Sequence, residues 1–423
     1  MSSQGAPTAD LGDVAPARSR HQGRRSAVTL TDGLAVVGTA DGDLQAFDAS
    51  TDSGPPRPRW QYDTDGEPSV VAAVPFDGGV VVGERSARGE IRCHDADGDL
   101  RWRYETSSDL GEAQQETRFL LPFVASLATD GDCLYAAARR YERRTDDEGN
   151  DLRHFESVVY AFAPDGTVDW RYRTDGSPIS LDASDGRVAV AYNRCPGDHQ
   201  HGLVVLNADA GDPRWMWDPG TDGQRRAGDV ALLEHGAVVS SHGDYCGYRL
   251  DSGGHERWRV PLATPTDVDG DTVYAYPNHV HATEAGAVFV TGNTYPEEGR
   301  ETDARHPSEH TAIGVSPDGN RRWDAPVGGF ASGLGTDGSL LAVPGAQNFR
   351  DRDADDHALR LFDVVDGPID TLDTDGVVTA AAVSDGTAVA VEEPVVYHDE
   401  GRERGAYRLH RVEVETDTAR LHR

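Results

Sequence analysis

The feature that most restricts the fold of this 423-residue chain is an internal repeat. The pattern Gly-x-x-x-Trp recurs along the chain, and a looser copy carries Trp60. The five full copies are Gly98/Trp102, Gly166/Trp170, Gly211/Trp215, Gly254/Trp258 and Gly319/Trp323. Each follows a short segment of alternating apolar and polar residues, such as LQAFD at 44–48 or LVVLN at 203–207. Such self-similarity is typical of proteins built from repeated supersecondary units.

A second landmark is a pair of alternating apolar segments joined by a tight Asp-Gly turn. Examples are AVTLTDGLAVVG (27–38), SLATDGDCLYAA (126–137) and AAVSDGTAVAV (381–391). Asp-Gly between alternating apolar residues predicts a β-hairpin, because glycine tolerates a positive φ. The period of two and the Val, Tyr and Phe content favour strands, and no segment sustains a period of 3.6.

Each repeat therefore predicts four strands, and eight repeats can be counted. We predict an all-β fold, an eight-bladed β-propeller of four-stranded antiparallel blades, over residues 23–423. Residues 1–22 are predicted to be a disordered N-terminal tail. The recurrent Trp is predicted to pack between neighbouring blades. Thr371 and Leu421 stand where the last two repeats would carry it, which makes the ring closure less regular there.

These motifs carry a family resemblance. The combination of V-V-x-G, L-x-A-F-D, D-x-x-G-x-x-x-W and x-T-D-G-x-P, over about residues 26–421, resembles the PQQ-like β-propeller repeat. That repeat occurs in quinoprotein dehydrogenases and in the propeller lipoprotein of bacterial outer-membrane assembly. The resemblance implies the propeller fold. It does not imply an activity, because many proteins with this repeat bind no quinone.

The charge of the chain limits the partners that it can have. The chain has 40 basic residues, all of them Arg, and 73 acidic residues, which gives a net charge of −33. This composition resembles that of proteins from salt-in halophiles and argues against nucleic acid as a partner. No apolar stretch is long enough to span a membrane, and the first twenty residues lack a secretory signal. Cys93, Cys133, Cys195 and Cys246 are scattered, so we expect reduced thiols and a cytoplasmic, monomeric protein.

The predicted insertions fall on one face of the propeller. Strand direction alternates, so the second-to-third and fourth-to-first connections share one face. All the long connections are of these two kinds. Variable loops on a rigid scaffold are where binding sites usually lie. One of these loops holds Arg139, Arg140, Arg143, Arg144 and Arg153, which predicts either an anion site or an internally paired surface loop.

Histidines and cysteines gather in the fourth to sixth repeats. His279 and His281 form His-x-His on a predicted inner strand, where a period of two puts both rings on one side. We expect them at the channel mouth on the face of the long loops. The candidate ligand-binding residues are His279, His281, His199, His201 and His242, and the candidate metal ligands are His279, His281, Cys195 and Cys246. Structural or surface histidines are the alternative.

Motifs for catalysis are absent from the sequence. It contains no nucleophile elbow, zinc-protease, Walker or dinucleotide-binding motif. No residue here can be matched to the catalytic Asp of quinoproteins, and the vicinal disulfide that many of them carry is absent. We therefore expect a non-catalytic scaffold that binds a protein partner or small ligand through its loop-rich face, with its cofactor unknown. A quinone- or metal-dependent oxidoreductase is the alternative.

Overall fold

The protein is almost entirely β-structure in the computed structural model, which describes residues 6–18, 24–50, 54–64, 68–145, 148–299, 302–346, 348, 353–397 and 401–414. Within those ranges the helical elements are α1 (Ser107–Leu110) and the 3-10 turn η1 (Ala354–Asp356). None of the described helices has the length and hydropathy that crossing a bilayer requires.

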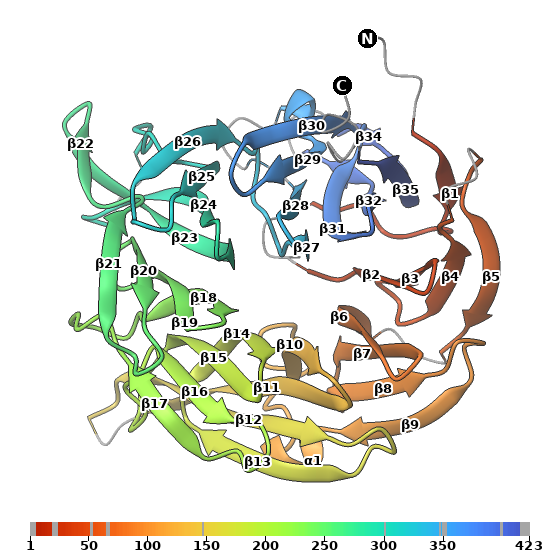
Figure 1. Ribbon diagram of the computed structural model, residues 1–423, viewed down its shortest axis with the longest axis horizontal. Coiled ribbons are helices and arrows are strands. Elements are labelled where there is room, and N and C mark those ends of the chain that lie inside the picture. Colours follow the sequence, from red (N-terminus) through yellow and green to blue (C-terminus); the bar gives the residue numbers. More distant parts are fainter. Residues whose placement is uncertain are drawn as a thin grey trace.

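The strands form a closed ring of eight four-stranded antiparallel blades, as the repeats predict (Figure 1). From the innermost to the outermost strand, the first blade is β2 (Ala27–Thr31), β3 (Leu34–Gly38), β4 (Leu44–Asp48) and β5 (Arg57–Tyr62); the second is β6 (Ser69–Phe76), β7 (Gly79–Arg85), β8 (Glu90–His94) and β9 (Leu100–Glu105); and the third is β10 (Phe123–Asp130), β11 (Cys133–Thr145), β12 (Asp151–Phe162) and β13 (Val168–Thr174). The fourth blade is β14 (Ser177–Ser184), β15 (Arg187–Arg194), β16 (Leu203–Asn207) and β17 (Pro213–Trp217); the fifth is β18 (Ala227–Leu233), β19 (Gly236–Ser241), β20 (Cys246–Leu250) and β21 (Glu256–Pro261); and the sixth is β23 (Asp271–Thr283), β24 (Gly286–Pro296), β25 (Thr311–Val315) and β26 (Arg321–Pro326). The seventh blade is β27 (Gly335–Asp337), β28 (Leu340–Gly345), β29 (Ala358–Asp363) and β30 (Gly367–Asp373), and the eighth is β31 (Val377–Ser384), β32 (Thr387–Glu393), β35 (Arg408–Glu413) and β1 (Thr8–Asp10).

Three further strands decorate this ring. β22 (Thr266–Val268) pairs with the first half of β23, so the sixth blade has five strands. β33 (Val395–Val396) and β34 (Glu403–Arg404) pair with each other beside the eighth blade. A single residue pair, Phe123 with Arg85, also joins the second and third blades into one hydrogen-bonded sheet.

The Asp-Gly turns have the backbone geometry that the sequence predicts. Asp32, Asp77, Asp185 and Asp385 all have positive φ, between 45° and 52°, and the glycine after each is also at positive φ. Two successive residues with positive φ match the twist of the strands that they connect. These turns therefore place the first two strands of a blade in register.

The Gly-x-x-x-Trp pattern is explained by contacts between adjacent blades. The Trp102 ring lies over Gly166 of the next blade, so that a Cβ at Gly166 would fall 2.7 Å from the indole. The Trp102 indole N–H also donates to the carbonyl of Pro164 in the same turn, at 2.9 Å. Each glycine of the pattern has positive φ and carries the Trp of the preceding blade in this way. The prediction that the Trp packs between blades is confirmed.

The ring is closed by the start of the chain, which the sequence did not predict. Thr8–Asp10 pair with β35 and form the outermost strand of the eighth blade (Figure 1). The Leu11 amide donates to Tyr407 O at 3.0 Å, and the Leu11 side chain is 4% exposed. The expectation of a disordered tail over residues 1–22 is therefore wrong for this segment, because it covers an edge that would otherwise be unpaired. Leu421, the expected member of this outer strand, lies outside the described residues.

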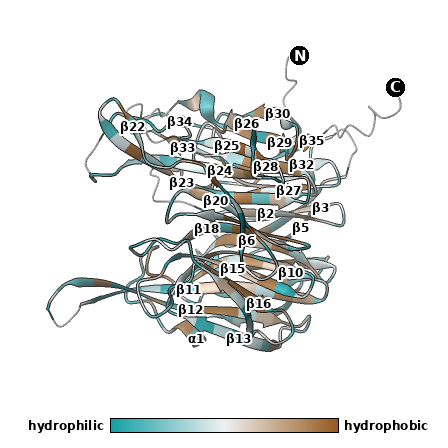
Figure 2. Ribbon diagram, turned by 60° about the vertical axis from the view of Figure 1, so that its left-hand side comes forward, coloured by the Kyte–Doolittle hydropathy of each residue, from teal (hydrophilic) through white to brown (hydrophobic). Residues whose placement is uncertain are grey.

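The two faces of the ring differ as predicted. We call "turn face" the side with the Asp-Gly turns, and "loop face" the side with the second-to-third and fourth-to-first connections. The loop face carries the long connections: residues 106–122, 195–202, 218–226, 302–310, 353–357 and 401–407, with α1 in the first. Hairpin β11–β12 also extends on this side, well beyond the body of the ring (Figure 2).

Candidate functional site

The paired histidines on β23 form hydrogen bonds that join two neighbouring blades. His279 Nε2 lies 3.0 Å from Ala331 O, and His281 Nε2 lies 2.8 Å from Gly338 O, both acceptors in the next blade and its approach. Gly338 belongs to the Asp-Gly turn of that blade, so His281 lies towards the turn face. This position is opposite to the predicted one. Burial lowers the pKa of His281, which favours a neutral ring.

The two histidines of the fourth blade lie in one compact loop with Cys195. The His199 ring lies against Tyr192, with ring centroids 4.3 Å apart, and its Nε2 donates to His201 O at 2.9 Å. The Cys195 thiol is 3.6 Å from the same carbonyl. The His201 carbonyl thus accepts from both the His199 ring and the Cys195 thiol, and these contacts hold the loop in a compact conformation.

His242 has an unusual environment. Its side chain is 4% exposed, and neither ring nitrogen has a hydrogen-bond partner. The ring rests on Gly228, where a Cβ would fall 2.5 Å from Nε2, and lies beside Tyr276 with centroids 4.9 Å apart. Burial, and then the charge of Arg225, lower the pKa of His242 to about 3. The imidazole is therefore neutral near pH 7.

The four proposed metal ligands are not brought together. Cys195 packs in the apolar core between the third and fourth blades, and Cys246 in the core between the fourth and fifth. Burial raises the pKa of each thiol to about 12, so neither is a thiolate near neutral pH. His281 lies towards the other face. Within the described ranges, no group of three or more His, Cys, Asp or Glu side chains is arranged to hold a metal ion.

A cluster of arginines that sequence reasoning missed lies on the loop face, and we call it the arginine arc. It consists of Arg85, Arg118, Arg139, Arg194 and Arg225. Arg85, Arg139 and Arg194 come from the second strands of three consecutive blades, and the other two come from connections that lead into the third and fifth blades. The Arg85 guanidinium carbon is 4.0 Å from the centroid of the Phe123 ring, and that of Arg139 is 5.3 Å from the same centroid.

The guanidiniums of the arc lack counter-charges. Among the described residues, none of the five forms an ion pair with a carboxylate within 4.0 Å. Burial lowers the pKa of Arg85 well below its ordinary value, and the charges of Arg118, Arg139 and Arg24 lower it further. Arg139 donates from Nη1 to Ser177 Oγ at 2.6 Å, but its buried Nε has no acceptor.

Other arginines of the same hairpin behave differently. Arg140 and Arg144 both pair with Glu142, and Arg144 also lies 3.4 Å from Glu156. The paired-loop alternative therefore holds for these two residues. Arg153 lies close enough to Arg194 to depress its pKa further, after the effects of burial and of Arg225. The hairpin thus adds positive charge to the arc.

The sequence contained a signal for part of the arc. Arg85, Arg139 and Arg194 stand seven or eight residues after the turn glycine of their blades, at positions 78, 131 and 186. Alignment of the repeats on that glycine would place the three on one face. Arg118 and Arg225 stand in connections of unequal length, so only the closed ring brings them alongside.

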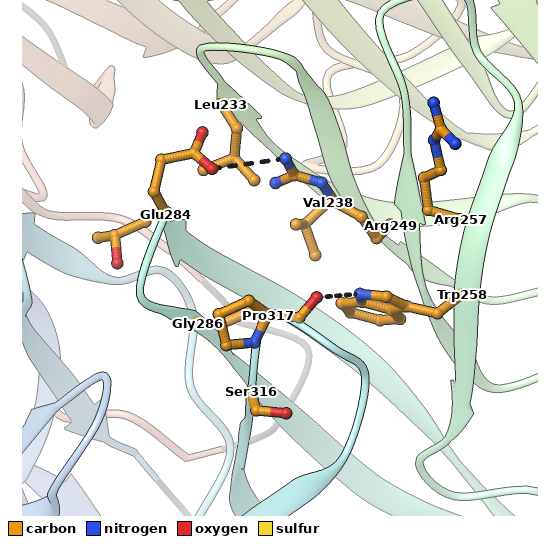
Figure 3. Close-up of a pocket in the computed structure, with 11 residues that line it drawn as sticks. Leu233, Val238, Arg249, Arg257, Trp258, Glu284, Gly286, Ser316 and Pro317 are labelled. Atoms are coloured by element: carbon orange, nitrogen blue, oxygen red, sulfur yellow. Dashed lines mark hydrogen bonds and ion pairs between the residues drawn. The ribbon is translucent and has the colours of Figure 1, made fainter.

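The clearest cavity lies elsewhere, on the turn face between the fifth and sixth blades (Figure 3). Its volume is about 180 Å³, and its walls include Arg249, Glu284 and Trp258. Arg249 and Glu284 lie 3.5 Å apart across it, and the Trp258 N–H is bonded to Pro317 O. Ligand pockets usually measure about 300–1,000 Å³, so this space is a gap between blades with its polar groups already occupied.

Comparison with known proteins agrees with this architecture. Residues 17–145 match the family model described as outer membrane protein assembly factor BamB. The whole chain thus has the β-propeller fold, and residues 17–145 resemble the PQQ-like repeat. BamB from Moraxella catarrhalis superposes with a TM-score of 0.54 at 15% identity, over 96% of this chain and 98% of that one.

Two structures of Sqt1 superpose on this chain about equally well. Sqt1 from Saccharomyces cerevisiae gives a TM-score of 0.58 at 11% identity, over 97% of this chain and all of that one. Sqt1 from Chaetomium thermophilum gives 0.53 at 13% identity, over 95% and 98% of the two chains. At such identities the similarity shows the fold alone. No curated protein sequence matches this chain.

Proposed function

We propose that this propeller is a non-catalytic scaffold that binds a protein partner through its loop face. The observation that supports the proposal is the concentration of insertions there, on a ring whose other face has short turns. Two large apolar side chains lie exposed in these insertions: Phe119 is 63% exposed in the connection before the third blade, and Leu152 is 47% exposed on hairpin β11–β12.

Exposed aromatic and aliphatic side chains on protruding loops are the kind of groups that anchor protein interfaces. The rigid ring below them favours binding, because a preformed surface loses little conformational entropy on association. The proteins whose structures resemble this one, BamB and Sqt1, are themselves propellers. We therefore expect the interface to centre on the third blade.

The test is affinity capture from native lysate at high salt with three forms of the full chain. A partner should be captured by the wild type and lost by the double variant Phe119→Ser/Leu152→Ser. Val365→Ser is the matched control, because Val365 is 38% exposed in the turn between β29 and β30, on the turn face. Equal capture by the double variant and the control would reject the proposal.

A further inference from the structure

We propose that the arginine arc is a binding site for a small multivalent oxyanion, a molecule that carries two or more phosphate or carboxylate groups. This inference goes beyond the proposed scaffold function and does not require a protein partner. The loop face would then carry two separate sites: the exposed apolar loops, and an anion site at the inner ends of the second to fifth blades.

The first argument is the missing counter-charge. The chain has 73 acidic residues for 40 basic ones, so carboxylates are abundant. Among the described residues, no ion pair joins a carboxylate to any of the five arginines of the arc, although elsewhere Arg92 pairs with Glu84 at 2.9 Å in a buried site. Partly buried like charges without partners are unfavourable. An anion bound between them would remove that cost.

The carboxylates nearest to the arc are already occupied. Asp229 Oδ2 accepts from the Val280 amide at 2.9 Å, and its Oδ1 accepts from Val230. Glu393 pairs with Arg25 at 2.6 Å and accepts from Ser26 at 2.7 Å. Both carboxylates therefore serve the ring itself, and the charge of Glu393 offsets that of Arg118 only in part, because burial and Arg25 still lower the pKa of Arg118.

The second argument is the orientation of the guanidiniums. Arg85 and Arg139 both lie near the Phe123 ring, and Arg225 lies over Tyr276 with its guanidinium carbon 4.7 Å from the ring centroid. A guanidinium that stacks on an aromatic ring uses its face and leaves its N–H donors free at the edge. Free donors in a planar fork match the oxygens of phosphate and carboxylate.

The third argument is the extent of the cluster. Arg85 is influenced by Arg118 and Arg139, and Arg194 by Arg225, Arg153 and Arg139, so the charges form one continuous group. His242 adjoins Arg225 at the far end, where the charge of Arg225 lowers its pKa after the effect of burial. A single monovalent ion would satisfy only one or two of these donors. The arc therefore fits a ligand with several oxyanion groups.

The experiment uses the full chain in KCl at fixed ionic strength, with pyrophosphate and citrate as the two probes. We expect at least one probe to raise the Tm in a saturable way, by about 3–8 °C at a hundredfold excess over Kd. A stronger effect of pyrophosphate identifies a phosphate ligand, and a stronger effect of citrate identifies a carboxylate ligand. A shift no larger than that of additional KCl of equal ionic strength would overturn the proposal.

Variants locate the site. Arg85→Gln should weaken the binding of the active probe at least tenfold, and its Tm without probe should equal or exceed that of the wild type, because repulsion within the arc falls. Arg194→Gln tests the same point if the first variant fails to fold. The control is Arg101→Gln, since Arg101 pairs with Asp77 at 2.8 Å on the turn face. If both arc variants bind the probe like the control, the site does not exist. The Phe119 and Leu152 variants leave the arc intact, so the scaffold proposal fails or succeeds separately.

Discussion

The contact between one tryptophan and one glycine is the smallest unit that holds this ring together. Each of the first six blades offers an indole to the next, and each receiving turn has a glycine because a Cβ would enter the ring. The glycine also has positive φ, which is 83° at Gly166. The Gly and the Trp of one repeat therefore contact different neighbours: the Gly meets the Trp of the preceding blade, and the Trp meets the Gly of the following blade.

Substitution of Gly166 separates these two requirements. Gly166→Ala should lower the free energy of unfolding by about 1–3 kcal/mol from steric conflict with Trp102, in addition to roughly 1 kcal/mol of backbone strain. Gly270→Ala is the matched control, because its φ is 89° and a Cβ there meets nothing within 4 Å. Denaturant unfolding at constant salt measures both. Equal losses would mean that the Trp does not restrict the site.

Single residues also show where sequence reasoning stopped. The arginine arc could be found only in part, since Arg118 and Arg225 have no fixed offset from any repeat landmark. The histidines were easier to notice. In the sequence, however, a histidine that donates to a carbonyl of the next blade, as His279 and His281 do, cannot be distinguished from a histidine that binds a ligand. Only the carbonyl that accepts the hydrogen bond, which lies more than fifty residues away in the sequence, distinguishes a structural histidine from a ligand-binding one.

Among the elements, the innermost strands are joined by carboxylates that reach across blades. Asp182 of β14 accepts from the Leu232 amide of β18 at 2.7 Å, and Asp229 of β18 accepts from Val280 of β23 at 2.9 Å. The same contact thus joins the fourth blade to the fifth and the fifth blade to the sixth. Burial raises the pKa of Asp182 to about 6 despite these hydrogen bonds.

This raised pKa predicts a pH effect with a definite sign. The proton on Asp182 stabilises the fold fully below about pH 4, and this contribution is lost as the pH rises through about 6. Asp182→Asn cannot titrate. The stability of the wild type relative to the variant should therefore fall by about 1–3 kcal/mol between pH 4 and pH 7.5. Thermal unfolding of both proteins across that range checks it, and a constant difference would contradict the assignment.

The strands themselves were mostly predictable, for a physical reason. Alternation and Asp-Gly turns are local, and each of them is visible within a dozen residues of sequence. Strand β1 was missed because Thr8–Asp10 are too short to show alternation, and their partner, β35, lies at the other end of the described chain. A strand that forms because it pairs with an available sheet edge needs no alternating pattern of its own, so its sequence does not predict it.

At the scale of the whole molecule, the net charge of −33 is the main influence on how the stability of the fold depends on salt. Repulsion between surface carboxylates opposes the compact state, and salt weakens it because the Debye length falls from about 10 Å at 0.1 M to about 3 Å at 1 M. We predict that the Tm rises between about 0.1 M and 2–3 M KCl, and that far-UV circular dichroism shows loss of β-structure on dialysis to low salt. An unchanged spectrum and Tm would contradict this.

The closure of the eighth blade has a consequence for biosynthesis. Asp10 pairs with Arg408, so strand β1 leaves the ribosome long before its partner β35. At about 5–20 residues per second, roughly 20–80 s separate their appearance. During that interval the nascent ring is an open arc with a vacant edge at each end. Unpaired strand edges are templates for association with other chains, so slow synthesis lengthens the period in which this chain is prone to aggregate.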